Sequence, residues 1–210
     1  MRFPFLSYVA IGSQALPILF GVLYYRTLDW GLRTLLYFFA IDFCLTTLSI
    51  ILALTKTNNI WLIQLDSLLR YVVFLAAYAI WQERKILRSS LVLLIVCYTA
   101  FWSWYSLFNH SFGEYDAVSR SVAKVILASA SVVMLYLLSN RDDKRMTRDF
   151  RFWVALGTLT YCAGTLLLSS FGGSVLKSFE MFALVWPINW ILFSLANGFY
   201  SKAMACSSQK

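Results

Sequence analysis

Charged residues are scarce in this chain: Asp, Glu, Lys and Arg make up 13% of its 210 residues, whereas 60% are hydrophobic. Soluble domains usually carry about 25% charged and about 45–50% apolar residues. The chain also contains apolar stretches of roughly twenty residues, each long enough for a helix to cross ~30 Å of hydrocarbon. These proportions exclude an ordinary soluble domain and indicate an integral membrane protein.

Histidine occurs once, at His110, and no glycine-rich phosphate-binding loop is present. A single histidine cannot form the multi-histidine zinc site of seven-helix ceramidase-like hydrolases, and it gives little support to Ser/His or Cys/His catalysis. A retinal Schiff base needs a lysine deep in a helix, but the only lysine of the last apolar stretch, Lys177, lies at its rim. We therefore expect no enzyme activity, no cofactor and no metal.

The apolar stretches predict an all-α, polytopic membrane protein with seven transmembrane helices. Short polar turns separate them, and no change in composition marks a second domain. We expect a single seven-helix transmembrane domain over residues 1–202 and a short cytoplasmic tail over 203–210. The predicted spans are residues 4–25, 34–55, 60–81, 88–108, 117–139, 150–171 and 176–200.

Basic residues gather on one side of these spans. Twelve of the eighteen Lys and Arg residues lie in the turns 26–33, 82–88 and 141–151 or after residue 200, and five lie on the opposite side. Cytoplasmic loops carry such an excess, which predicts an outside N-terminus and a cytoplasmic C-terminus. The net charge of +8 is thus explained by topology and anionic lipid head groups, and we expect no nucleic-acid partner.

Two charged residues, Asp66 and Arg70, interrupt the third span, in LIQLDSLLRYVVFLAAYAIW at residues 62–81. By helical rise they lie roughly 9 Å and roughly 15 Å from the outer end, and Asp42 of the second span reaches a similar level. An unpaired charge at this depth costs a few kcal/mol, so we predict an Asp42–Arg70–Asp66 cluster inside the bundle. Such a cluster either only holds helices together or belongs to a ligand or ion site; we favour the second interpretation.

Polar and aromatic residues of other spans are expected near this level. The predicted ligand-binding set is Gln14, Asp42, Asp66, Arg70, Tyr71, Tyr161, Glu180, Trp186 and Asn189. Pro17 and Pro187 are predicted hinges, because proline removes a backbone hydrogen bond. A polar opening on the outer side is expected from His110, Glu114, Asp116, Arg120, Lys124 and Glu180 together with Asp66, although each alone is typical of a solvated helix end.

The turn RDDKRMTRDFR, residues 141–151, mixes five basic and three acidic residues. We expect it to contact lipid head groups, and it is also a candidate surface for a protein partner. Tryptophans near predicted span ends are interpreted as anchors at the bilayer interface. They are Trp30, Trp61, Trp81 and Trp153.

Three features of the sequence resemble a known group of proteins. They are the segment YVAIGSQALPILFGVLYYR, the short basic inner turns and the Trp-Pro-Ile-Asn segment of the last span. With these features the chain resembles a loose group of uncharacterised bacterial seven-helix integral membrane proteins. It is also similar in layout to seven-helix sensing modules of bacterial signalling proteins, but it lacks their output domain. The resemblance implies a location in the bacterial cytoplasmic membrane. Seven-helix sugar carriers share the topology, but their Pro-Gln signature is missing.

Three functions remain open. The first is a receptor-like or sensory module that binds a small polar ligand from outside. The second is a small-solute or proton-coupled transporter, and the third is an accessory subunit of a membrane complex. We favour the sensory module, because it uses both the buried charges and the outer polar residues.

Overall fold

The computed structural model describes residues 5–108, 116–140, 146–175 and 179–207, with backbone alone at 107, 167, 169–175 and 179–185. These residues form helices and, within the described ranges, no strand. The helices are α1 (Phe5–Ser13), α2 (Ala15–Leu23), η1 (Tyr25–Thr27), α3 (Trp30–Leu54), α4 (Ile60–Trp81), α5 (Lys85–Phe108), α6 (Ala117–Ser139), η2 (Met146–Arg148), α7 (Phe150–Val175) and α8 (Phe179–Cys206).

Each predicted span corresponds to a helix or a pair of helices, and the bounds of α4 and α6 are those predicted. Five helical segments of the described chain are long and apolar enough to cross a membrane. They are Phe5–Leu23, Trp30–Leu54, Ile60–Trp81, Lys85–Ser106 and Ala117–Ser139. By length and composition, therefore, this is an all-helical integral membrane protein.

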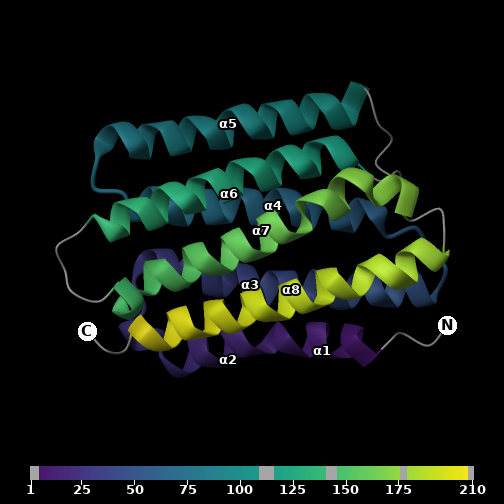
Figure 1. Cartoon of the computed structure of the whole chain (residues 1–210), viewed down its shortest axis with the longest axis horizontal. Helices are drawn as coiled ribbons and strands as arrows, with labels where there is room; N and C mark the ends of the chain where they lie inside the picture. The colour runs from purple at the N-terminus through teal and green to yellow at the C-terminus, as the bar shows by residue number, and fades with distance from the viewer. Residues whose placement is uncertain (1–4, 109–115, 141–145, 176–178, 208–210) are drawn as a thin grey trace.

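The helices lie side by side in one bundle (Figure 1). The segment α1–α2 and the helix α5 lie on opposite flanks; α1 and α2 pack against α8, and α5 packs mainly against α4. We call the end of the bundle that holds Phe5, the α3–α4 turn and the start of α6 the N end. The opposite end, with the start of α3 and the end of α8, is the C end.

The first predicted span, 4–25, is two helices rather than one. The break falls at Gln14, whose backbone N–H bonds the carbonyl of Ile11 at 3.1 Å in a turn. Pro17 explains it, because its ring has no N–H for the carbonyl of Ser13 and collides with a helical carbonyl four residues earlier. The predicted irregularity at Pro17 is thus present. At Pro187, in contrast, α8 continues without interruption.

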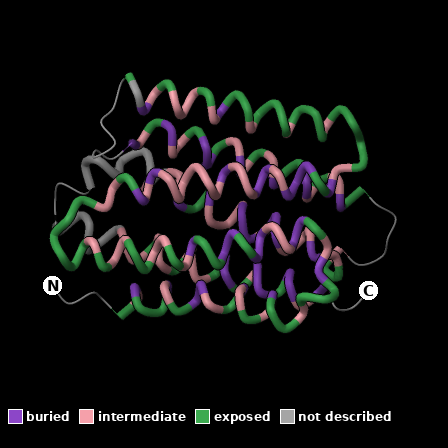
Figure 2. The backbone as a smooth tube through the Cα atoms, turned by 180° about the vertical axis from the view of Figure 1, so that it is seen from behind, coloured by how far each residue is buried: buried purple, intermediate pink, exposed green. Residues whose placement is uncertain are grey.

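Buried residues gather toward the C end of the bundle (Figure 2). The largest fully buried side chains include Leu35, Phe74 and Tyr78. Close helix contact contributes there: a Cβ atom at Gly157 of α7 would lie 2.8 Å from Tyr200 of α8 and 3.2 Å from a backbone oxygen. Small residues let helices approach closely in membranes, so the C end is a dense apolar core.

One expectation at the C end is wrong. Trp81 is not an interfacial anchor: it is buried, and its indole Nε1 donates to Asp29 Oδ2 at 2.7 Å. Asp29 Oδ1 caps α3 by accepting from the backbone N–H of Leu32 at 2.9 Å, so one carboxylate serves both groups. The division into a domain over 1–202 and a tail over 203–210 stays a prediction; in the structure α8 continues to Cys206, and Ser207 donates to the carbonyl of Thr27 at 2.8 Å.

Candidate functional site

The predicted charge cluster is present. Arg70 Nη2 donates to Asp42 Oδ1 at 2.6 Å and to Asp66 Oδ2 at 3.5 Å. The first is a short, charge-assisted bond between α3 and α4, whereas the second is long and joins residues four apart on α4. The side chain of Asp42 is 3% exposed and that of Asp66 is 25% exposed. Asp42 is thus the principal partner of Arg70, and Asp66 is turned partly toward open space.

Gln14 extends the cluster to the first span. Its Nε2 donates to Asp42 Oδ2 and to Thr46 Oγ1, both at 3.1 Å. Each oxygen of Asp42 therefore has its own donor. Because the chain breaks at Gln14, this amide is held at the junction of α1 and α2, and hydrogen bonds from this junction reach α3 and, through Asp42, Arg70 of α4.

Three aromatic rings surround the guanidinium of Arg70. Its central carbon lies 5.3 Å from the ring centre of Phe38, 5.5 Å from that of Tyr161 and 5.6 Å from that of Phe193. Cation–π contacts of this kind strengthen when water is excluded. They come from α3, α7 and α8, so Arg70 contacts three helices besides its own. Phe38 also packs on Phe74 of the dense core, which places Arg70 at the boundary between core and polar site.

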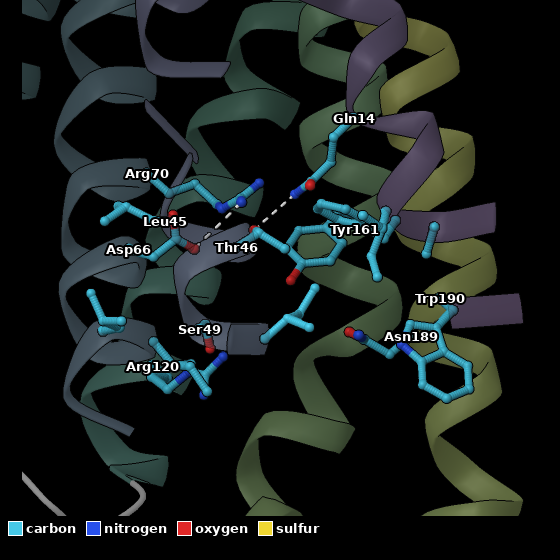
Figure 3. A pocket seen from close by; sticks show the side chains of 16 residues that line it. Gln14, Leu45, Thr46, Ser49, Asp66, Arg70, Arg120, Tyr161, Asn189 and Trp190 are labelled. Atoms are coloured by element: carbon cyan, nitrogen blue, oxygen red, sulfur yellow. Dashed lines mark hydrogen bonds and ion pairs between the residues drawn. The ribbon is translucent and has the colours of Figure 1, made fainter. Parts of the chain in front are cut away.

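A cavity of about 230 Å³ lies on the N side of Arg70 (Figure 3). At ~30 Å³ per water, this volume equals roughly eight water molecules. In Figure 3, Asn189 and Trp190 face Asp66 and Arg120 across the space, and the Tyr161 hydroxyl points into it. The polar and aromatic lining residues are Gln14, Thr46, Ser49, Asp66, Arg70, Arg120, Tyr161, Asn189, Trp190 and Phe193.

Two buried acceptor atoms at this cavity have no hydrogen-bond partner among the described residues: Gln14 Oε1 and Asp66 Oδ1. Leaving a buried polar atom without a partner costs about 1–3 kcal/mol, and more for a charged one. Both residues line the cavity. Although the two residues line the cavity, these two atoms are themselves fully buried, so a molecule in the cavity does not reach them in this arrangement of side chains.

A smaller space of about 30 Å³ adjoins this cavity and shares Asp66, Arg70, Arg120 and Tyr161 with it. Lys124 closes this recess, with its Nζ donating to the Thr165 hydroxyl at 2.7 Å and to the Thr165 carbonyl at 3.2 Å. The same Nζ lies 5.2 Å from the Tyr161 ring centre. The ring of Tyr161 thus contacts two cations, Arg70 and Lys124, and these contacts fix the ring where it lines both spaces.

Five of the predicted ligand-binding residues line the cavity. They are Gln14, Asp66, Arg70, Tyr161 and Asn189. Asp42 lies behind Arg70 and shapes the cavity floor through its hydrogen bonds rather than by lining it. The side chain of Glu180 lies outside the described residues, as do His110 and Glu114. Their part in the predicted polar opening stays a prediction.

Tyr71 does not belong to this site. Its hydroxyl donates to the carbonyl of Leu94 at 3.0 Å, and its ring lies 4.0 Å from that of Tyr98. Adjacent helical residues do not share a face, so the residue after Arg70 points toward α5. Trp186 is half-buried and is not among the cavity residues. The tryptophan that lines the cavity is Trp190, one helical turn after Trp186.

Asp116, expected at the polar opening, is a helix cap. Its carboxylate accepts from the backbone N–H of Ser119 at 2.9 Å and from the hydroxyl of the same residue. This is the ordinary role of Asp before a helix. Asp116 is 1% exposed and does not line the cavity.

Sequence reasoning missed Thr46 and Ser49 of α3 and Phe193 of α8. A signal for them existed: Thr46 and Ser49 follow Asp42 at helical spacing, and Phe193 lies four residues after Asn189. Residues at these spacings share a helix face. Following the helix face of each buried polar residue for one or two turns would therefore have identified all three residues.

No family model, curated protein or solved structure matches this chain. Within the described part of the chain, no three His, Cys, Asp or Glu side chains are grouped as a metal site would require. The chemistry of the cavity must therefore be inferred from its own geometry, namely three charged side chains, two amides and a phenol around one small space.

Proposed function

We propose that the chain spans the membrane seven times, with its N-terminus outside and its C-terminus in the cytoplasm. Besides the five apolar segments, α7 has 26 residues and α8 has 28, or about 39 Å and about 42 Å of helix. The segment α1–α2 counts as one span. The basic residues between and after the spans lie mainly at the C end, which is therefore the cytoplasmic side. The cavity then faces the outside.

We propose further that the protein is a receptor-like sensory module of the bacterial cytoplasmic membrane, with the cavity as its ligand site. The observation that supports this most is the position of Arg70. It contacts the cavity on one side and Phe38 of the packed core on the other, and it joins α3 and α4 directly. A molecule in the cavity therefore touches the group that ties the bundle together.

The signal would be a change in the partners of Arg70 and Gln14. A ligand that contacts Asp66 or Gln14 in the cavity alters the bonds that these side chains make with Arg70 and Asp42. Such a ligand shifts the helix arrangement only by as much as it binds one arrangement more tightly than another. Pro17 and Pro187 are the proposed hinges, since Pro17 follows Gln14 by three residues and Pro187 precedes Trp190 by three.

A thermal-shift screen of small polar solutes on the purified chain in detergent tests this function. Bound solute should raise the unfolding temperature in a concentration-dependent way. Asn189→Ala should weaken the effect, because the amide lines the cavity and makes no hydrogen bond to the described residues. Asn140→Ala, at the C end, is the matched control and should respond like the parent protein. A screen without any response, or equal responses of both variants, would argue against a site in this cavity.

The alternative is a small-solute or proton-coupled transporter. A polar cavity that is closed on one side also occurs in carriers that expose their site alternately to each side. Reconstitution in proteoliposomes separates the two functions. A sensor binds the solute that raised the unfolding temperature without moving it across the membrane. A transporter moves it, and Asp42→Asn should then abolish the flux.

A further inference from the structure

A groove runs between α5 and α6 in the C half of the bundle. In the N half the two helices touch, since the Tyr98 hydroxyl of α5 donates to the carbonyl of Ser119 of α6 at 3.0 Å. Toward the C end a cavity of about 350 Å³ lies between them, on the flank that α5 forms in Figure 1. Its walls are apolar and include Leu87, Leu91 and Leu94 of α5 and Ile126, Ala130 and Val133 of α6.

The groove opens toward the hydrocarbon of the bilayer. Met134 at its floor is buried, whereas Leu94 and Val133 on its walls are exposed. From Leu87 to Leu94 on α5, and from Val125 to Met134 on α6, the lining follows the helices for roughly 10–14 Å. One leaflet holds about half of the ~30 Å of hydrocarbon, so the groove covers most of one leaflet. An acyl chain that runs along the helices therefore fits it.

A polar cavity of about 330 Å³ adjoins the groove at the C end of the bundle. The two spaces share Gln82 and Met134. Gln82 Nε2 donates to Met134 Sδ at 3.7 Å, and a thioether sulfur is a weak acceptor. The ester carbonyl of a glycerolipid is a stronger acceptor. It would lie at this level, where the apolar chain of the lipid ends and its polar head begins.

Basic side chains gather where α5 begins. Arg84 lines the polar cavity, and its carbonyl accepts from the backbone N–H of Arg88 at 3.1 Å. Lys85 and Arg88 lie in the first turn of α5; we call Arg84, Lys85 and Arg88 the α5 basic group. All three are exposed, and their side chains form no ion pair or hydrogen bond with another described residue. Basic pockets at the cytoplasmic ends of membrane helices bind anionic lipid head groups.

The other charges beside this cavity offset one another. Arg151 Nε donates to both carboxylate oxygens of Asp149, at 2.9 and 3.0 Å. Glu83, which lines the cavity, also interacts electrostatically with Arg151. The α5 basic group is therefore the positive charge that a ligand can match. A phosphate diester is anionic, and its oxygens accept paired hydrogen bonds from a guanidinium.

We propose that the two spaces together bind one anionic phospholipid, with its phosphate at the α5 basic group and one acyl chain in the groove between α5 and α6. A neutral lipid would fill the groove without matching the charge. A soluble phosphate ester would match the charge and leave the groove empty. This site lies in the other half of the bundle from the ligand cavity, and the proposal does not depend on the proposed function.

Native mass spectrometry of the purified full chain in detergent tests the proposal. Phosphatidylglycerol and phosphatidylcholine with identical acyl chains are compared, because they differ in net charge and not in their tails. We expect phosphatidylglycerol to bind at least ten-fold more tightly and to give the larger rise in unfolding temperature. Glycerol 3-phosphate, a head without a tail, should bind at least ten-fold more weakly than phosphatidylglycerol. Equal affinities of the two lipids, or of phosphatidylglycerol and glycerol 3-phosphate, would overturn the proposal.

Variants of the α5 basic group locate the head. Arg84→Gln should lower phosphatidylglycerol affinity about five-fold, and Arg84→Gln combined with Arg88→Gln at least ten-fold. Phosphatidylcholine affinity should stay unchanged in both. Arg26→Gln is the matched control, because Arg26 is also exposed at the C end but lies on the opposite flank. An equal loss in the Arg26 and Arg84 variants would remove the head group from this position.

A pair of variants on α6 locates the tail. Val133→Trp places a large side chain in the groove and should weaken both lipids at least five-fold. Val132 is equally exposed but does not line the groove, so Val132→Trp is the control and should bind like the parent protein. Equal binding by the two variants would contradict the position of the acyl chain.

A second copy of this chain is the competing occupant of the groove. It would appear as a dimer that Val133→Trp dissociates, with lipid affinity unchanged, and this result would replace the lipid by the copy. If Val133→Trp fails to fold, the lipid comparison and the Arg84 variants still decide, since these substitutions are at exposed positions.

Discussion

The two halves of the bundle are held together by different forces, and α3 shows the difference within one helix. Seven residues between Gly31 and Asp42 are buried, whereas none between 43 and 54 is. The buried part packs in the C half on the aromatic core, and the other part lines a polar cavity in the N half. The helix as a whole is long and apolar enough to cross a membrane, so hydrophobicity alone does not decide which part packs.

The comparison teaches where a membrane bundle can place a site. Lipid is as apolar as a leucine side chain, so packing and polar contacts, rather than escape from water, hold membrane helices together. The C half uses close packing around its aromatic core, and its two cavities, of about 330 Å³ and about 350 Å³, lie beside that core along α4, α5 and α6. The N half relies on hydrogen bonds that Arg70 and Gln14 donate to Asp42, and it leaves space between the helices. The boundary between the halves is Arg70.

The largest expected effect comes from removing that boundary residue. Arg70→Ala leaves Asp42 and Asp66 without their cation, and breaking a buried charge pair from one side costs about 3–5 kcal/mol. Unfolding in detergent, followed by circular dichroism, measures the loss. Replacing all three charges, with Arg70→Met, Asp42→Leu and Asp66→Leu together, should restore most of the stability. Parent-like stability of Arg70→Ala would contradict this account of the boundary.

The next prediction compares a Leu→Ala substitution in the C half of α3 with one in its N half. Leu35→Ala removes a side chain that is fully buried in the C half and should lower the free energy of unfolding by about 2–5 kcal/mol. Leu45→Ala acts at the cavity wall, where the lost side chain enlarges an existing space, and should cost less than about 1 kcal/mol. Similar losses in the two variants would show that the halves are equally packed.

A smaller effect concerns added volume. Gly157→Ala places a methyl group 2.8 Å from Tyr200 in the C half and should destabilise by about 1–3 kcal/mol. Gly12→Ala, on α1 in the N half, meets no atom within 4 Å and should be neutral or stabilise by up to about 1 kcal/mol, because alanine is the better helix former. Chemical unfolding of both variants gives the comparison, and a destabilised Gly12→Ala would count against it.

The smallest expected effect is the loss of one hydrogen bond in the N half. Thr46→Val removes one acceptor from the Gln14 amide, which still bonds Asp42, and should cost about 0.6 kcal/mol. Thr47→Val, at an exposed position of the same helix, is the control. A loss larger than that of Leu35→Ala would mean that Thr46 holds the polar half far more firmly than its geometry indicates.

Much of this architecture is readable from local spacing in the sequence. The apolar stretches gave the helices, and the four-residue separation of Asp66 and Arg70 predicted that both lie on one face beside Asp42. Contacts between segments that are far apart in the chain could not be predicted from this spacing. Trp81 bonds Asp29, a residue 52 positions away, and nothing in the local pattern of either residue indicates it.

The cavity itself illustrates the same limit. Helical spacing places Tyr161 and Asn189 at the right depth, but depth does not give rotation about the helix axis, so Tyr71 was assigned to the wrong face. The break at Gln14 was also hidden, because a proline in a membrane helix can bend it, interrupt it or do neither. Pro17 and Pro187 stand in similar apolar surroundings, and only the first interrupts its helix.

The division of the first span has a consequence for biosynthesis. A nine-residue helix such as α1 or α2 covers about 13.5 Å, which is less than half of the hydrocarbon layer. Both helices pack against α8. Asn197 of α8 also donates a hydrogen bond to the hydroxyl of Ser13 at 2.9 Å. Within this chain, α1–α2 is therefore synthesised well before α8, the helix that covers its flank. Chains stalled before α8 should be the form that cellular quality control removes first.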